Sequence, residues 1–253
     1  LKETADFAIL EEKVPFLKDG NIKEKGSLGS IKEHCIRAID KALSRLSPRG
    51  LPLIGEGDWN DGLSSCGDKW KGESVWMGHF LYGILNDFCE VLEKSNDWNK
   101  VGHYRKSAKK LADAVNTAGW DGKWYLGATC DNGDKLGSGE NKEGKIFLNC
   151  QTWAILNKTV TEDRIASITA AMEKYLYREY GPLLLYPAYA HSNEEVGYLT
   201  RYAPGCRENG GLYTHAGVWA VQAECALKRN EMAYKLYKSF QPIRRGAQPD
   251  LYF

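Results

Sequence analysis

The sequence lacks the features that mark a membrane protein, a secreted protein or a nucleic-acid-binding protein. No apolar run approaches the roughly 20 residues that a transmembrane helix needs, and the first residues carry neither a signal-peptide core nor an initiator methionine. We therefore expect no membrane partner, and we expect the chain to begin inside a longer protein. Lysine plus arginine number 34 and aspartate plus glutamate 33, a net charge of +1, so no electrostatic field favours binding to nucleic acid.

Closely spaced cysteine pairs are missing as well. The seven cysteines are widely spaced, at positions 35, 66, 89, 130, 150, 206 and 225, and none belongs to a Cys-x-x-Cys pair. An odd count argues against a complete disulfide framework. This usage fits a reducing, cytoplasmic location best.

The composition is that of an ordinary globular protein with many polar aromatic residues. Its 253 residues are 43% hydrophobic and 26% charged, enough to bury a sizeable core in one large domain. No repeat or interdomain linker is visible, so we expect a single domain over residues 1–253. Eight tryptophans and fourteen tyrosines outnumber seven phenylalanines. Such residues often line saccharide clefts, although most of them pack between helices.

Most of the chain has helical periodicity. Residues 30–46 place apolar side chains three and four apart, and residues 73–92 are apolar on nearly every face, as in a buried helix. Turn-forming residues separate further helices, which we expect at about 101–118, 147–157, 162–177, 214–228 and 230–239.

Two segments break this pattern. Residues 124–130 have the character of a strand that enters an Asn132-Gly133 turn, which predicts a small surface hairpin near 124–137. Residues 182–209 form a long loop with Gly and Pro, a place where function is often found. The expected fold class is all-α, an α/α toroid with a cleft at one end. A plain helical bundle is the alternative, but loops 50–72 and 180–213 are too long for it.

One glycine-rich segment carries a concentrated set of polar groups, residues 50–62 (GLPLIGEGDWNDG). Trp59 offers a flat apolar face to a pyranose ring, and Asn60 can form hydrogen bonds with hydroxyls in both directions. Asp58 and Asp61 can accept hydrogen bonds or donate a proton. The glycines let the backbone turn sharply near a ligand. The segment therefore fits a sugar-binding catalytic loop.

An isolated Asp-Trp-Asn-Asp segment is equally compatible with a polar turn that caps the following helix, since Asp and Asn favour turns and caps. A calcium loop starting at Asp58 is excluded, because it needs a ligand at position 62 and a glycine at position 63. The chain has Gly62 and Leu63 there. A sugar-binding loop and a capping turn therefore stay open for this segment taken by itself.

A second polar cluster surrounds a Gly-Gly turn that enters a helix, in residues 202–219 (YAPGCRENGGLYTHAGVW). Backbone N–H groups of such a turn, together with the positive end of the helix dipole, can hold an oxyanion or a phosphate. A histidine that stands alone is more often structural. Here His215 lies near Arg207, Glu208 and Asn209, which favours a binding role.

Taken together, these segments resemble glycoside hydrolase family 94, the inverting β-glucoside phosphorylases of the cellobiose, cellobionic acid and chitobiose phosphorylase type. The resemblance covers nearly the whole chain and runs, in order, through residues 55–62, 71–76, 124–126, 143–153, 186–189 and 204–219. The combination is highly specific, whereas Asp-Trp-Asn-Asp alone would not be.

The resemblance implies an (α/α)6 toroid that cleaves a β-linked disaccharide or oligosaccharide with phosphate, giving an α-sugar 1-phosphate and a shortened acceptor. It implies these roles: Asp61 as general acid, Trp59, Asp58, Asn60 and Glu208 as substrate-binding residues, and His215 as a phosphate-binding residue. No metal and no organic cofactor are implied, only inorganic phosphate as co-substrate. Family members are often homodimers, so a homodimer is a possible assembly.

The chain also departs from the family pattern. It lacks a Thr-Gly pair that helps to hold phosphate, an upstream Arg-Asp pair for the glycone, the N-terminal β-sandwich domain and the C-terminal end of the barrel. We therefore expect an incomplete catalytic domain, poorly soluble and with little activity of its own. Two other functions fit the residues: an inverting hydrolase with Glu208 as base, which needs its carboxyl groups about 6.5–9.5 Å apart, and an inactive carbohydrate-binding fragment.

Overall fold

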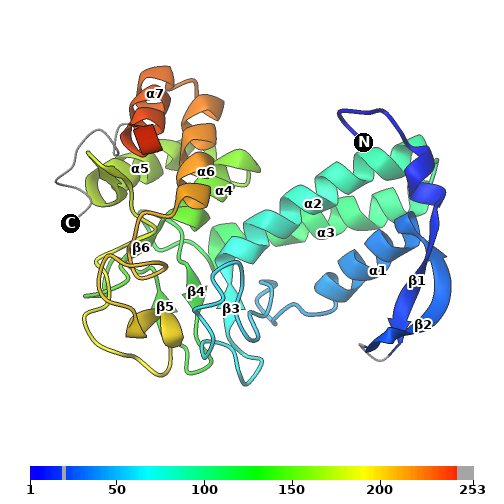
Figure 1. Ribbon diagram of the computed structural model, residues 1–253, viewed down its shortest axis with the longest axis horizontal. Coiled ribbons are helices and arrows are strands. Elements are labelled where there is room, and N and C mark those ends of the chain that lie inside the picture. Colours follow the sequence, from blue (N-terminus) through cyan, green and yellow to red (C-terminus); the bar gives the residue numbers. More distant parts are fainter. Residues whose placement is uncertain (19–20, 244–253) are drawn as a thin grey trace. The chain divides into compact units, whose positions relative to one another are not determined.

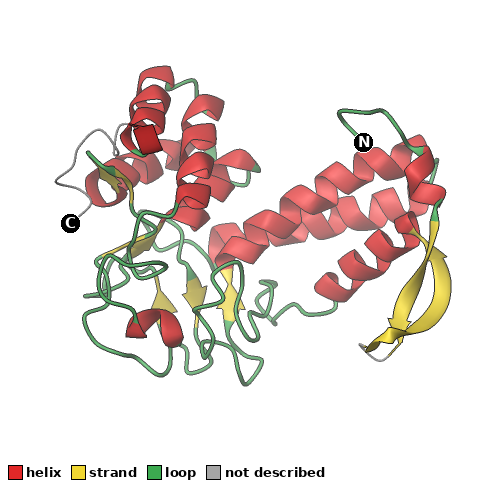
Figure 2. Ribbon diagram, viewed as in Figure 1, coloured by secondary structure: helices red, strands yellow, loops and turns green. Residues whose placement is uncertain are grey.

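The computed structural model describes residues 1–18 and 21–243 and is mostly helical (Figures 1 and 2). Within these residues the chain forms seven α-helices and several short β-strands. It divides into two compact units, Leu1–Leu46 and Ser47–Phe253. None of the described helices is long and apolar enough to cross a membrane.

The first unit contains a hairpin and a helix. Strands β1 (Lys13–Lys18) and β2 (Asn21–Ser30) pair antiparallel, after a short 3-10 helix, Ala8–Glu11. Helix α1 (Ile31–Leu43) begins at a capping box, in which the Glu33 N–H donates to Ser30 Oγ and the Ser30 N–H donates to Glu33 Oε2. The helix predicted over 30–46 is confirmed. The hairpin was not predicted, although the Asp19-Gly20 pair between its strands is a known hairpin signal.

The second unit is built on helix pairs. Helices α2 (Val75–Lys94) and α3 (Trp98–Thr117) follow each other through a three-residue turn and pack together, as do α6 (Thr214–Ala226) and α7 (Asn230–Ser239). Helix α4 (Leu148–Leu156) packs against both α2 and α6. Helix α5 (Glu162–Ala171) continues into a π-helical turn, Met172–Leu176, so the last turn predicted over 162–177 is not α-helical.

Short strands join the loops between these helices. Strands β3 (Glu73–Ser74), β4 (Ala128–Thr129) and β5 (Lys135–Leu136) form one antiparallel sheet. Two further pairs are β6 (Ile146–Phe147) with β9 (Leu185–Tyr186), and β7 (Tyr177–Arg178) with β8 (Gly181–Pro182).

The hairpin predicted near 124–137 is present as β4 and β5, but its predicted surface position is wrong. Ala128 and Leu136 are buried in the hydrophobic core of this unit. Strand β3 pairs with the outer edge of β4 and joins the hairpin to the start of α2. The alternation of residues within the hairpin cannot reveal that it pairs with a two-residue strand from a segment more than 50 residues away.

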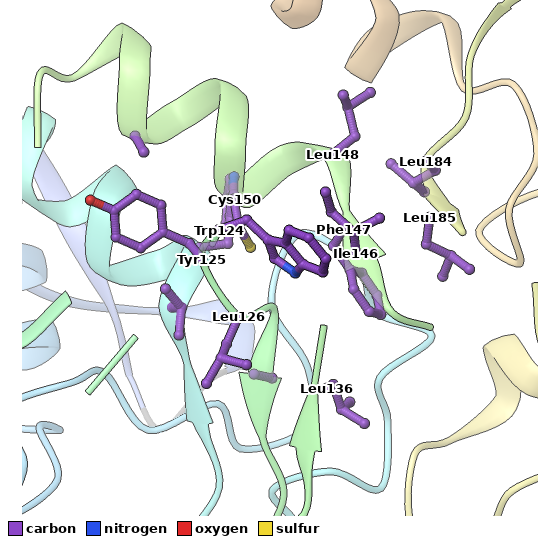
Figure 3. Packing of buried hydrophobic residues seen from close by; sticks show 14 of the residues in the cluster. Trp124, Tyr125, Leu126, Leu136, Ile146, Phe147, Leu148, Cys150, Leu184 and Leu185 are labelled. Carbon is purple, nitrogen blue, oxygen red and sulfur yellow. The ribbon is translucent and has the colours of Figure 1, made fainter. Parts of the chain in front are cut away.

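The core of the second unit surrounds these strands and α4 (Figure 3). Residues 124–126 pack there with Ile146, Phe147 and Cys150, all of them buried. Gln151, fully buried in α4, holds the backbone of Tyr125: its Oε1 accepts the Tyr125 N–H (2.9 Å) and its Nε2 donates to the Tyr125 carbonyl (2.7 Å). This amide takes the place of a strand partner for a buried backbone group.

Asp131 ties the end of β4 to the loop before β3. Its carboxylate accepts the backbone N–H groups of Lys69 (2.7 Å), Lys71 (2.8 Å) and Gly72 (2.8 Å). Burial works to raise the pKa of Asp131, but these three donors outweigh it and lower the pKa. The ionised carboxylate therefore stabilises the fold of this loop.

We expect Asp131→Asn to lower the free energy of unfolding at pH 7 by about 1–3 kcal/mol, because the amide loses the charge that strengthens three hydrogen bonds. The folded-state pKa lies below the unfolded value, so the stabilisation is present above the unfolded pKa and is lost as the pH falls through the folded pKa. Urea unfolding at several pH values measures this, with Asp134→Asn in the same turn as control. A loss that stays constant down to pH 3 would contradict the charge argument.

Candidate active site

The loop of residues 55–62 is folded by its own polar side chains. Asp58 Oδ1 accepts the Asn60 N–H (2.7 Å), and Asn60 Oδ1 accepts the Gly62 N–H (3.2 Å). Gly57 has φ +133°, a conformation that favours glycine, and a Cβ there would lie 3.1 Å from Asp61 Cα. Asp58 and Asn60 thus use their side chains within the loop, while Asp61 remains exposed.

A second bond fixes the loop to helix α2. The Ser74 hydroxyl donates to Asp58 Oδ2 (2.6 Å). Ser74 is also the N-cap of α2, because its Oγ accepts the Met77 N–H (3.0 Å). Burial raises the pKa of Asp58 to about 6, against the lowering effect of the bonds from Ser74 and Asn60. Asp58 and Asn60 also line a small cavity of about 20 Å³, room for one water molecule and not for a sugar.

Trp59 brings the loop to the beginning of α6. Its ring meets three aromatic rings edge-on, those of Tyr213 (5.2 Å between centroids), His215 (5.6 Å) and Trp219 (5.3 Å). Trp219 continues the contact to Trp153 of α4 (5.1 Å). The structure therefore joins the two polar clusters that lie about 150 residues apart in the sequence.

Asp61 lies beside two tyrosines. The hydroxyl of Tyr198 lies near the Asp61 carboxylate. Burial and then this carboxylate raise the pKa of Tyr198 to about 12. Tyr213 also lies close enough to feel the charge of Asp61. Tyr198 was missed from the sequence, where no motif contains it, and Tyr213 was not singled out within its segment.

Glu208 is the second carboxylate of the site and is only 4% exposed. The Tyr213 hydroxyl lies near it, and Arg207 Nε lies 3.5 Å from Glu208 Oε2. That distance makes an ion pair without hydrogen-bond geometry, so among the described residues Oε2 has no hydrogen-bond donor. A buried carboxylate oxygen in this state is suited to accept a bond from a ligand hydroxyl.

Asn209 holds the loop that carries Glu208. It is fully buried, its Oδ1 accepts the Tyr189 N–H, and its Nδ2 donates to the carbonyls of Tyr189 and Tyr202, all at 2.8 Å. Every polar atom of this side chain is therefore engaged with backbone, which fixes the loop.

His215 lies in the first turn of α6 and is exposed. Its ring contacts Trp219 (4.3 Å between centroids), and the N-cap residue Tyr213 makes no side-chain cap bond. The first backbone N–H groups of a helix carry a partial positive charge and bind anions well. An imidazole beside them adds one more donor.

The site thus combines an exposed carboxyl group, an indole edge, a buried carboxylate oxygen and a helix N-terminus. This set can bind a saccharide and an anion side by side and can donate a proton. Among residues 1–18 and 21–243, no group of three or more His, Cys, Asp or Glu side chains is placed to hold a metal ion.

Comparison with known families decides the classification. The family described as glycosyl hydrolase 94 superfamily, catalytic domain, matches residues 1–251. The chain belongs to the glycosyl hydrolase 94 superfamily. The resemblance drawn from the sequence motifs is thereby confirmed, and the family is one of inverting disaccharide phosphorylases.

Three curated relatives show how far the likeness to single proteins extends. Solabiose phosphorylase of Paenibacillus borealis is 38% identical over 96% of this chain and 31% of its own length. The cyclic beta-(1,2)-glucan synthase NdvB of Rhizobium meliloti (strain 1021) is 36% identical over 95% of this chain and 9% of its own. N,N'-diacetylchitobiose phosphorylase of Vibrio furnissii is 30% identical over 97% and 30%. The chain therefore spans less than a third of the length of these relatives.

We expect Asp58→Asn to change how stability depends on pH. Between pH 4 and about 6 the folded protein keeps a proton on Asp58 that the unfolded chain has lost, so this carboxyl lowers stability as the pH rises. The shift corresponds to about 3 kcal/mol. In urea unfolding, the stability of the wild type relative to Asp58→Asn should fall by about 2–3 kcal/mol from pH 4 to pH 7.5.

The exposed Asp113→Asn variant is the control for that series and should show no such trend. If the stability of the wild type relative to Asp58→Asn instead rises with pH or stays constant, the buried carboxyl of Asp58 is ionised in the folded protein throughout the range.

Proposed function

We propose that this chain carries the acid- and phosphate-binding part of an inverting phosphorylase. The reaction is attack of phosphate on a β-linked glucoside, which gives an α-sugar 1-phosphate and a shortened acceptor. The observation that supports it best is the meeting of the Asp61 loop with the N-terminus of α6, through the contact of Trp59 with His215. A proton donor and an anion site would then lie on either side of Trp59 and act on the same bound sugar.

Asp61 is the proposed general acid. Its carboxyl group is exposed on a loop whose backbone is fixed by Asp58 and Asn60, so it can reach a glycosidic oxygen. Phosphate itself supplies the nucleophile, and the leaving group needs one proton, so a single carboxyl group is sufficient for the chemistry.

Trp59 and Glu208 are the proposed contacts to sugar. The indole ring of Trp59 is held in place by its T-shaped contact with Trp219 of α6. It can cover the apolar side of a pyranose. The unbonded oxygen of Glu208 can accept a hydroxyl of the acceptor sugar. We propose that Asp58 and Asn60 serve the sugar site indirectly, by shaping the loop that carries Trp59 and Asp61.

His215 and the first turn of α6 are the proposed phosphate site. N–H groups at a helix start that the N-cap side chain does not bond, together with an imidazole donor, can give an anion several hydrogen bonds at once. Phosphate bound there lies beside Trp59 and so next to the sugar.

The hydrolase alternative uses the same two carboxyl groups. It would take Glu208, which pairs with Arg207, as the base that activates water instead of as a contact to the acceptor sugar. Phosphate dependence of the reaction distinguishes the two.

We also infer that the second unit is part of an (α/α)6 toroid. The consecutive helix pairs α2–α3 and α6–α7 are the repeating feature of that architecture, and α4 packs between α2 and α6. Long loops that carry the site at one end of such helices fit the same plan.

We expect Asp61→Asn to reduce phosphorolysis by about 100- to 10,000-fold, the usual contribution of general acid catalysis. The assay follows the reverse reaction in the full-length protein, which needs the same carboxyl group to take the proton of the acceptor hydroxyl. It measures phosphate release from α-glucose 1-phosphate with a panel of glucose, gluconate, N-acetylglucosamine and oligoglucoside acceptors. Asp68→Asn, an exposed carboxylate of the neighbouring loop, is the control. Full activity of Asp61→Asn would remove the proposed acid.

We expect His215→Ala to raise the KM for phosphate by about 10- to 100-fold, because it removes one hydrogen bond to a charged ligand. The KM for the disaccharide should change much less. Initial rates of phosphorolysis over a range of phosphate concentrations, and separately over a range of disaccharide concentrations, measure the two constants. His191→Ala, an exposed histidine on another loop, is the control. An unchanged KM for phosphate would place the phosphate site elsewhere.

A further inference from the structure

The 3-10 helix of Tyr198–Arg201 packs directly on the chain after Asp61. The Leu199 N–H donates to the Gly62 carbonyl (3.0 Å), and the Tyr198 N–H donates to Ser64 Oγ (3.3 Å). Two backbone segments that are far apart in sequence are thus fixed to each other next to the proposed acid.

The contact between these segments is tightly packed. A Cβ on Gly62 would lie 2.6 Å from Leu199 Cβ, and a Cβ on Gly197 would lie 2.4 Å from the Ser64 nitrogen. Gly197 also has φ +124°, which disfavours other residues. The backbone at Tyr198 is therefore held at a fixed position relative to Asp61.

The side chain of Tyr198 is held as well. Its ring meets that of Tyr202 edge-on, with 5.9 Å between centroids, and its hydroxyl lies near the Asp61 carboxylate. Burial and then the nearby carboxylate raise the pKa of this phenol to about 12, so the hydroxyl keeps its proton at any working pH and can donate a hydrogen bond to the carboxylate.

An exposed carboxyl group samples several side-chain rotamers unless a neighbour holds it. Proton transfer needs one of them, because the donor must lie within hydrogen-bond distance of the glycosidic oxygen. A fixed phenol that bonds one carboxyl oxygen leaves the other oxygen to carry the proton toward the substrate.

We propose that Tyr198 is a positioning residue for Asp61, which holds the acid in the orientation that protonates the leaving group. This inference rests on the proposed function of Asp61. Tyr198 itself touches neither the sugar nor phosphate in this role.

Tyr198→Phe is the direct test, because phenylalanine keeps the ring and loses only the hydroxyl. We expect kcat for a disaccharide to fall by about 10- to 100-fold, the cost of a misplaced catalytic group, with KM for sugar and phosphate unchanged. The substrate is the disaccharide found with the acceptor panel, and the full-length protein is used. Tyr202→Phe, which removes the hydroxyl of the neighbouring ring, is the control and should keep full activity.

A second substrate separates positioning from a general structural effect. The 2,4-dinitrophenyl β-glycoside of the same sugar has a leaving group that departs without a proton, so loss of the acid matters little for it. Both Asp61→Asn and Tyr198→Phe should therefore lose much less activity on this substrate than on the disaccharide.

The outcomes are distinguishable. If Asp61→Asn loses the same factor on both substrates, the proposed function of Asp61 fails. If Asp61→Asn shows the expected difference and Tyr198→Phe does not, the positioning role is wrong. The positioning role is also overturned if Tyr198→Phe loses the same factor on both substrates or keeps its full rate on the disaccharide. It is overturned as well if circular dichroism shows that Tyr198→Phe does not fold.

Discussion

The hydrogen bond between Ser74 and Asp58 is the point on which the site depends. One serine oxygen caps helix α2 and donates to the loop that carries Asp61, so the helix and the loop share a single anchor. The preceding residue in the chain, Glu73, is almost fully buried and is paired with Arg49, which also bonds Thr129 of β4. The start of α2, the short sheet and the Asp61 loop are therefore fixed together within a few residues.

Aromatic packing then sets where the second half of the site lies. Trp59 links the loop to α6, because its ring touches three residues at the beginning of that helix. Behind them, Trp219, Trp153 and Trp76 pack together through α6, α4 and α2. Large packed rings fix the elements that carry them relative to one another, because they have few rotamers and bury much area. The acid and the anion site are thus positioned by the same cluster that holds the helices together.

Much of the helical structure could be predicted from sequence, for a simple reason. A stripe of apolar residues with a period near 3.6 is a local signal, and α1 and α3 each carry it over three or more turns, whereas α2 is recognised by being apolar on nearly every face. The two-residue strands carry no such signal, because they form only where distant loops meet. The hairpin of β1 and β2 was missed because its strands are rich in charged residues and lack clean alternation.

The site divides in the same way. Asp61, Trp59, Glu208 and His215 lie in motifs and could be named from their residue types and their resemblance to a family. Tyr198 lies in no motif, and its relation to Asp61 arises from the contact of Leu199 with Gly62, which only the fold reveals. The use of Asp58 and Asn60 inside the loop was equally hidden, since the sequence shows polar side chains and not the backbone groups that they bond.

The most direct test of the account is the product formed from a β-linked disaccharide in the presence and absence of phosphate, followed by ³¹P and ¹H NMR with the full-length protein. The account predicts an α-configured sugar 1-phosphate as the first product and no cleavage without phosphate. Free sugar released at the same rate without phosphate would contradict it and identify a hydrolase.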